Sequence, residues 1–445
     1  METGFPLVML VGPVVMAIVA LVVRKYRRIS VIIGVATMLS LAFLLSLAAP
    51  GTGLFADNTV GFLGREAVMS PFVRSLFLFM YPAMGLIFLM AWARPVGRAL
   101  VPAGLAVLSP LAAALMISPA GLGAVLLVAA AAVVVPTLHG GKFDAVVPAW
   151  RYFLLAAVAL APVLLVASGS MITTFPAGWS APLLATLILL GGFPFHIWAG
   201  ALGRHISPVV AALVLGLLQL VVVSFLLSLL DSVPGARAAT EFQLAIRWSA
   251  ALTALIGAFA MARAIDWRGV VAGAILLDMG LLLPAVLVPG TDGFMIAIPA
   301  LIARYLALLL VGLGLAGRLS IEEPAPPGRL PALLRPALLL YGLLSLIGLP
   351  LTPGFAGRWA QLAVVGQSGG MWPTLLLVFA LAAATAAIVR MTRHRLAATA
   401  ESATIVGTFS AFEFGLMLFL VVISTLIGLF PGLLIGLAAR MLGLG

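Results

Sequence analysis

The stretch GGFPFHIWAGALGRHISPVVAAL, residues 191–213, places two prolines, two histidines, an arginine and a tryptophan inside an otherwise apolar run. Proline lacks a backbone donor and collides with the carbonyl four residues earlier, so Pro194 predicts a break in the helix. At the depth of a bilayer, the freed backbone groups need partners from neighbouring helices or from water in a cavity. On its own, the break is equally compatible with an ion path and with a packing kink.

The rest of the chain has the composition of a polytopic membrane protein. Of its 445 residues, 64% are hydrophobic and 8% are charged, and the mean hydropathy is +1.27. The chain has no cysteine, which excludes disulfides, thiol catalysis and ligation of iron–sulfur clusters by this chain. The N-terminus, METGFPLVMLVGP, has no basic region and no small-residue cleavage site, so its first apolar run is predicted to be a retained helix.

Apolar runs bounded by charges and by Gly or Pro turns predict an all-α fold of about fourteen transmembrane helices, each of roughly 20 residues. Helices seven and twelve are expected to be broken by proline. The expected cores are 6–23, 29–49, 73–93, 99–116, 120–138, 148–168, 181–203, 207–230, 244–263, 269–290, 293–316, 333–368, 370–390 and 414–436.

The distribution of basic residues predicts the orientation of these helices. The net charge is +11, but the basic residues are scattered singly between apolar spans, which indicates loop charges and not a nucleic-acid surface. Seventeen lie in one set of alternate loops, and the other set holds only Arg65, Arg74, Arg237, Arg247 and Arg440. The positive-inside rule makes the first set cytoplasmic and places both termini on the outer face.

The whole chain, 1–445, is predicted to form a single membrane domain with a polar, proline-rich cytoplasmic linker at 317–331. No segment outside the predicted spans is long enough to fold alone, so a nucleotide-binding or soluble catalytic domain is not expected. If ATP or NADH drives this protein, another chain has to collect that energy.

Polar residues at membrane depth are the candidates for function. An ionisable group near the bilayer centre costs roughly 2.5–3.5 kcal/mol on insertion scales, so such groups usually face a protein interior or a hydrated path. Asp278 can be a proton carrier or the partner of Arg304 on the next helix, and the sequence favours neither. His196 can titrate near neutral pH or cap carbonyls freed by Pro194. The full set of candidates is His196, Asp278, Arg304 and Arg358, with Gln219 and Tyr305 as neutral companions.

A second interruption lies in LLSLIGLPLTPGFAGRW, residues 343–359, where Pro350, Pro353 and Gly354 fall in a run too long for one straight crossing. Arg358 lies just past this break. Two interrupted helices, each beside a polar residue, are typical of a transporter core. The sequence favours a channel-facing Arg358 over an arginine that reaches to the membrane interface.

These segments resemble the antiporter-like membrane subunits of respiratory complex I. The first stretch resembles their broken seventh helix, with matches at Pro194, Phe195, His196, Trp198 and 207–209. Other segments agree in order along the chain: VVPAWRYFLL, AIDWRGVVAGAILLDMG, SLIGLPLTPGFAGRW and IGLFPG. The resemblance covers an antiporter-like core at 120–435, which leaves 1–119 as peripheral N-terminal helices, and it is greatest to the type called subunit N.

The resemblance implies a proton path formed by charged residues in the middle of the membrane. This sequence lacks most of those charged residues. The family's glutamate in helix five aligns at about Ala131, and its lysine before the first break aligns at about Leu189. The helix-eight position falls between Val214 and Gln219, so only the basic site at Arg358 persists. Alanine and leucine cannot ionise, and arginine keeps its proton at physiological pH. These losses favour reduced or absent pumping.

The resemblance therefore implies a multi-pass subunit of a complex I-like NADH/quinone oxidoreductase in a bacterial cytoplasmic (inner) membrane. Such a subunit takes part in proton translocation, does no catalytic chemistry itself, and lies in the lipid bilayer among other membrane subunits. Flavin, nicotinamide and clusters would lie on those partners, so no cofactor, no metal and no nucleic acid is expected on this chain. The alternatives are a structural subunit that has lost ion transport, and a subunit of an Mrp-type cation/proton antiporter or a membrane hydrogenase-like complex.

Overall fold

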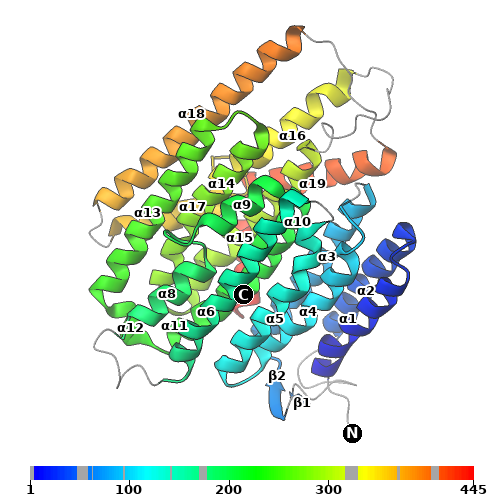
Figure 1. The fold of residues 1–445 in the computed structure, drawn as a ribbon, viewed down its shortest axis with the longest axis vertical. Coiled ribbons are helices and arrows are strands. Elements are labelled where there is room, and N and C mark those ends of the chain that lie inside the picture. The colour runs from blue at the N-terminus through cyan, green and yellow to red at the C-terminus, as the bar shows by residue number, and fades with distance from the viewer. Residues whose placement is uncertain are drawn as a thin grey trace.

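The computed structural model describes residues 5–47, 59–62, 64–93, 96–140, 143–169, 178–315, 329–367, 371–401 and 410–444. Within these ranges the chain is a bundle of helices with one small hairpin (Figure 1). Its longer helices are α1 (Phe5–Val22), α2 (Arg27–Leu47), α3 (Pro71–Ala93), α4 (Leu100–Met116), α5 (Ala120–His139), α6 (Val146–Ala167), α11 (Gln219–Asp231), α13 (Thr240–Arg263), α14 (Trp267–Leu282), α15 (Gly290–Leu315), α16 (Arg329–Ile347), α17 (Phe355–Gln367), α18 (Met371–Glu401) and α19 (Ala411–Leu429).

The shorter elements lie mainly at breaks and turns. They are β1 (Thr59–Phe62), β2 (Arg65–Val68), η1 (Phe143–Ala145), α8 (Ser180–Leu189), α9 (Ile197–His205), α10 (Pro208–Ala211), η2 (Ala212–Leu218), α12 (Pro234–Ala238), η3 (Leu283–Leu287) and α20 (Gly432–Met441).

Ten helices in the described part of the chain are long and apolar enough to cross a membrane, and five shorter apolar helices accompany them. A helix satisfies its backbone hydrogen bonds internally, which is why apolar sequence in a bilayer folds this way. The predicted all-α, multi-pass membrane architecture is confirmed. The count of fourteen crossings and the outward termini stay predictions, as does the division at residue 119.

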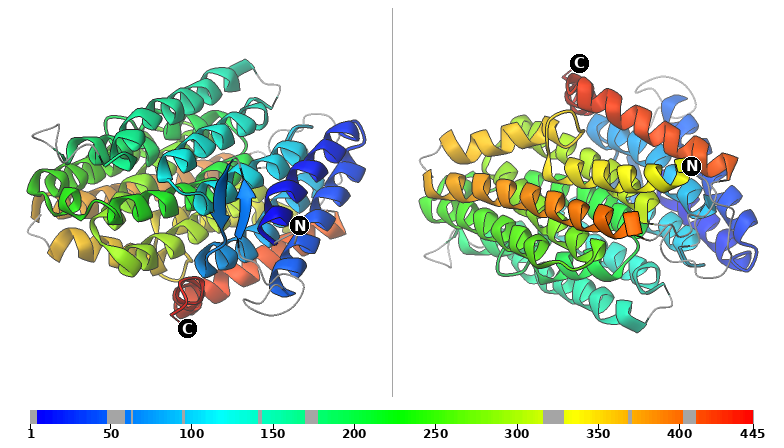
Figure 2. Two further views of the ribbon diagram at one scale, coloured as in Figure 1. Left: turned by 90° about the horizontal axis from the view of Figure 1, so that it is seen from below. Right: turned by 90° about the horizontal axis from the view of Figure 1, so that it is seen from above.

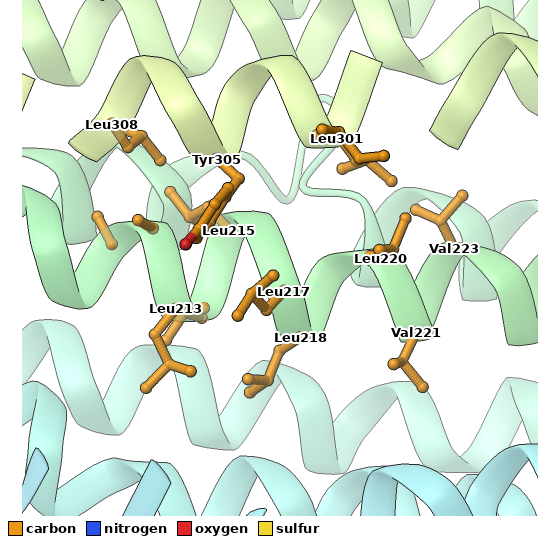
Figure 3. Close-up of a cluster of buried hydrophobic side chains, with 14 of the residues drawn as sticks. Leu213, Leu215, Leu217, Leu218, Leu220, Val221, Val223, Leu301, Tyr305 and Leu308 are labelled. Atoms are coloured by element: carbon orange, nitrogen blue, oxygen red, sulfur yellow. The ribbon is translucent and has the colours of Figure 1, made fainter. Parts of the chain in front are cut away.

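The centre of the bundle is formed by α14, α15 and the continuous segment α10–η2–α11, whose apolar windows are almost entirely buried. In contrast, only 28% and 33% of the corresponding windows that contain α6 and α18 are buried. Figure 3 shows Leu301, Tyr305 and Leu308 of α15 packed across from the leucines of η2 and α11. The C-terminal helices α19 and α20 both pack back against α3 and α15 (Figure 2).

The segment η2 is a π-helix of seven residues. At its end the backbone N–H of Gln219 donates to the carbonyls of Val214 and Gly216. In an α-helix that N–H would bond to the carbonyl of Leu215, four residues back. The π-helical turn therefore leaves the Leu215 carbonyl available to a side chain from another helix, and π-helical turns are frequent at functional sites.

Two expectations are corrected. The last span, expected as one helix over 414–436, is two helices, because α19 ends at Leu429 and α20 begins at Gly432. Phe430 precedes Pro431, and the residue before a proline is disfavoured in the helical region. The antiparallel hairpin β1–β2 was not expected, and Ala67 of β2 pairs further with Ile117 beyond α4. Most of the expected linker 317–331 lies outside the described residues, and α16 begins at Arg329.

Candidate functional site

Three charged side chains meet in the interior of the bundle and form what we call the central triad: Asp278 of α14, Arg304 of α15 and Arg358 of α17. Asp278 Oδ2 accepts a hydrogen bond from Arg304 Nε, and Asp278 Oδ1 forms an ion pair with Arg358 Nη2. The residues are 0%, 2% and 3% exposed. Two guanidinium groups against one carboxylate leave the triad with an excess positive charge in a low-dielectric interior.

Arg304 is held by more than the carboxylate. Its Nη1 donates to the carbonyl of Leu215 at 3.2 Å, which is the carbonyl left available by the π-helical turn of η2. Its Nη2 lies 3.5 Å from the carbonyl of Asp278, and Nη1 lies 3.5 Å from the sulfur of Met279. Arg304 therefore ties α15 to both η2 and α14.

Arg358 is held by the broken helix twelve. Helix α16 ends at Ile347 and α17 begins at Phe355, with Pro350 between them. Pro350 has no N–H to donate to the carbonyl of Leu346, four residues earlier, and Arg358 Nη2 donates to that carbonyl at 2.8 Å. Arg358 Nη1 also donates to Gln361 Oε1 at 3.0 Å. This arginine lies in the bundle interior and does not reach to an interface.

Two glycines make this geometry sterically feasible. A Cβ on Gly348, whose φ is +76°, would lie 2.0 Å from Cγ of Arg358. A Cβ on Gly354 would lie 1.8 Å from the carbonyl oxygen of Ser345. The Gly354 N–H donates to Ser345 Oγ at 3.2 Å. The break thus folds backbone closely against backbone and leaves space for the arginine side chain.

The break in helix seven lies between α8, which ends at Leu189, and α9, which begins at Ile197. The backbone N–H and carbonyl of Phe193, inside this break, form hydrogen bonds with two side chains of α13 that the sequence did not single out. The N–H of Phe193 donates to Thr253 Oγ1 at 2.8 Å, and Ser249 Oγ donates to the carbonyl of Phe193 at 2.9 Å. The His196 ring stacks on Phe193, with 5.8 Å between ring centres.

Replacing Thr253 by Val is expected to lower the free energy of unfolding by about 0.5–1.5 kcal/mol, because it removes the acceptor of the partly buried Phe193 N–H at nearly constant side-chain volume. Hydrogen exchange of the Phe193 amide, followed by mass spectrometry in detergent, should accelerate. Thr385→Val is the matched control, since its hydroxyl donates only to Leu381 O within its own helix α18. Equal effects of the two changes would contradict this role for Thr253.

The remaining candidates lie outside the central triad. Tyr305 follows Arg304 in sequence, but its hydroxyl donates to the carbonyl of Ala83 on α3 at 2.6 Å. Gln219 Nε2 donates to the carbonyl of Leu189 at 3.0 Å, which links α11 to the end of α8.

The positions where the resemblance expects lost charges line one and the same cavity. Ala131, Leu189 and Gln219 all line a cavity of about 50 Å³, together with Tyr152 and Trp198. No acidic or basic side chain is among the residues described around this cavity. No group of three or more His, Cys, Asp or Glu side chains that could hold a metal ion occurs in the described ranges.

Comparison with known proteins gives no match to a family model and no match to a curated protein. Solved structures share the fold over nearly the whole chain. A chain of the membrane-bound sulfane sulfur reductase (MBS), an archaeal respiratory membrane complex, has a TM-score of 0.79 at 15% identity, covering 98% of this chain and 96% of that chain. A chain of the Mrp complex from Dietzia sp. DQ12-45-1b has a TM-score of 0.76 at 14% identity, covering 99% and 96%.

A chain of respiratory complex I from Thermus thermophilus with bound NADH has a TM-score of 0.69 at 21% identity, covering 98% of this chain and 100% of that chain. At these identities the likeness establishes the fold. The resemblance inferred from the proline-broken motifs is confirmed at that level.

Proposed function

We propose that this chain is an antiporter-like membrane subunit of a complex I-like redox assembly, where it takes part in proton translocation through fixed charge. The observation that carries the proposal is the central triad, in which Arg358 from a broken helix is paired with Asp278 at the centre of the bundle. The fold is shared with chains of respiratory complex I, an archaeal respiratory complex and an Mrp complex. The finer features that go with this proposal are a subunit N type, a bacterial inner membrane location and outward termini.

The residues of the triad suit an electrostatic role better than a carrier role. Both oxygens of Asp278 are engaged by guanidinium groups, and arginine keeps its proton at physiological pH. The repulsion between an excess positive charge and a proton about 10 Å away is roughly 1.7 kcal/mol at an effective dielectric constant of about 20. An energy of this size changes the proton occupancy of a neighbouring site more than tenfold.

A structural subunit that has lost ion transport is the second candidate, and the cavity beside Leu189 favours it. Passing a proton between two groups requires that both can titrate and that each shifts the other. Ala131 and Leu189 supply no titratable group to this cavity, and the amide of Gln219 is bonded to a backbone carbonyl. In this case the chain would contribute only its fold and its interfaces.

The parent assembly is tested by purifying the tagged chain from native membranes in mild detergent and identifying every co-migrating protein by mass spectrometry. Subunits that oxidise NADH or ferredoxin, together with quinone-reactive membrane subunits, are expected. Recovery with only small cation-transport subunits would overturn the redox assembly and favour an Mrp-type antiporter.

The role in translocation is tested in the same complex with the triple variant Asp278→Leu, Arg304→Met, Arg358→Met, which removes every charge of the triad together. We expect fewer protons moved per electron at unchanged redox turnover in proteoliposomes. An unchanged proton-to-electron ratio would refute the electrostatic role and leave the structural subunit. The variant Asp144→Asn, at an acid whose side chain is 61% exposed, is the control for a loss of charge elsewhere.

A further inference from the structure

A large groove runs along α3 on the side of the bundle that faces α19 and α20. Its volume is about 620 Å³, within the range of roughly 300–1,000 Å³ that is usual for small-molecule sites. Its walls come from α2, α3, α15, α19 and α20, and they include Leu39, Leu78, Phe79 and Phe419. The groove lies outside the central triad and outside the cavity beside Leu189.

The groove is long and narrow. Along α3 it extends from Ser75 to Leu89, a rise of about 21 Å along the helix axis. A volume of about 620 Å³ over this length leaves room for an extended hydrocarbon chain.

One end of the groove carries a positive charge. Arg440 of α20 is the one charged residue among the described residues of the wall. Its side chain is exposed, and within the described ranges it makes no hydrogen bond or ion pair. A basic residue at a membrane surface attracts anionic lipid headgroups. This attraction acts within about a Debye length and is screened beyond it.

The chain direction places this charge near a surface of the bundle. Ser75 lies one turn from the start of α3, which directly follows the hairpin β1–β2. The rings of Trp92 and Phe412 are 6.3 Å apart, so α19 starts beside the far end of α3 and runs back toward the hairpin. Helix α20 follows at that end, and Arg440 therefore lies where a lipid phosphate would meet the groove.

We propose that this groove binds one phospholipid with a net negative headgroup, with an acyl chain along α3 and the phosphate at Arg440. The apolar wall would contact the acyl chain of the lipid, and the guanidinium of Arg440 would contact its phosphate. The site does not depend on whether the protein moves ions.

The absence of cysteine from the chain permits a clean test in native membranes. In the variant Ser75→Cys, the single thiol in the groove wall is labelled with benzophenone maleimide. The membranes are then irradiated, the chain is purified, and its covalent adducts are identified by mass spectrometry. One phospholipid adduct per chain is expected, with anionic headgroups enriched about fivefold over the bulk membrane. Adducts to another polypeptide, or a headgroup distribution equal to that of the bulk membrane, would overturn the proposal.

Matched variants separate a specific site from general contact with lipid. Leu39→Trp fills the groove and should lower the lipid adduct at least fivefold, whereas Leu47→Trp on the same helix lies outside the groove. These leucines are 58% and 59% exposed, so neither change should disturb the packing of the buried core. Arg440→Gln should abolish the enrichment of anionic headgroups and retain the adduct, and Arg151→Gln should leave both unchanged. Equal effects within either pair would refute the site.

Discussion

The variant Asp278→Ala loses about 3–5 kcal/mol of its free energy of unfolding, the effect expected when one member of a buried ion pair is removed. Two guanidinium groups, 2% and 3% exposed, would then lie in the bundle interior without a counter-ion. Their remaining partners are mainly the neutral carbonyls of Leu215 and Leu346 and the amide of Gln361. The measurement is denaturant unfolding of the purified protein in mild detergent.

The triple variant Asp278→Leu, Arg304→Met, Arg358→Met decides whether uncompensated charge is the cause. Replacing a whole buried charge cluster by apolar residues of similar size is often neutral or stabilising, so this variant should recover most of the loss. Asp144→Ala, at an exposed acid, should change the free energy of unfolding by about 0.5 kcal/mol or less. A triple variant as unstable as Asp278→Ala would show that the triad stabilises the fold in another way.

Gly354→Ala is expected to cost about 3 kcal/mol, at the upper end of the range for overpacking. The new methyl group would lie 1.8 Å from the carbonyl oxygen of Ser345, and backbone lies on both sides of this contact. Separating them would also strain the hydrogen bond from the Gly354 N–H to Ser345 Oγ. Denaturant unfolding measures this loss as well.

The control for Gly354→Ala is Gly366→Ala, in the adjoining helix α17. A Cβ on Gly366 would meet no atom within 4 Å, and alanine in place of glycine inside a helix stabilises by about 0.5–1 kcal/mol. The two substitutions are therefore expected to have opposite signs. A gain in stability from Gly354→Ala would contradict the close packing at the break of helix twelve.

The sequence predicted the features that depend on local chemistry. Apolar runs of membrane-spanning length predicted the helices, and Pro194 and Pro350 predicted the two breaks, because the loss of a backbone donor is a property of the residue itself. The cost of charge at membrane depth singled out Asp278, Arg304 and Arg358. The pairing of Asp278 with Arg304 was one of two alternatives, and the structure has that pairing with Arg358 added.

Features that depend on contacts between distant segments could not be predicted in the same way. Ser249 and Thr253 serve the first break from a helix about 60 residues further on, and nothing in their own segment marks this role. The carbonyl of Leu215 is available only because η2 is π-helical, and its sequence, ALVLGLL, is apolar throughout. The hairpin β1–β2 has charged residues at Arg65 and Glu66, which are also typical of a loop.

The π-helical turn makes the length of that segment a constraint as strict as its composition. A π-helical turn holds one residue more than an α-helical turn, because its hydrogen bonds span five residues and not four. Removing one residue from Ala212–Leu218 would therefore allow a regular α-helix to run from α10 into α11 with little rotation of α11. The carbonyl of Leu215 would then bond within its own helix and be lost to Arg304. One extra residue thus keeps this carbonyl available to the central triad, and a deletion here should release Arg304 while the helices stay in place.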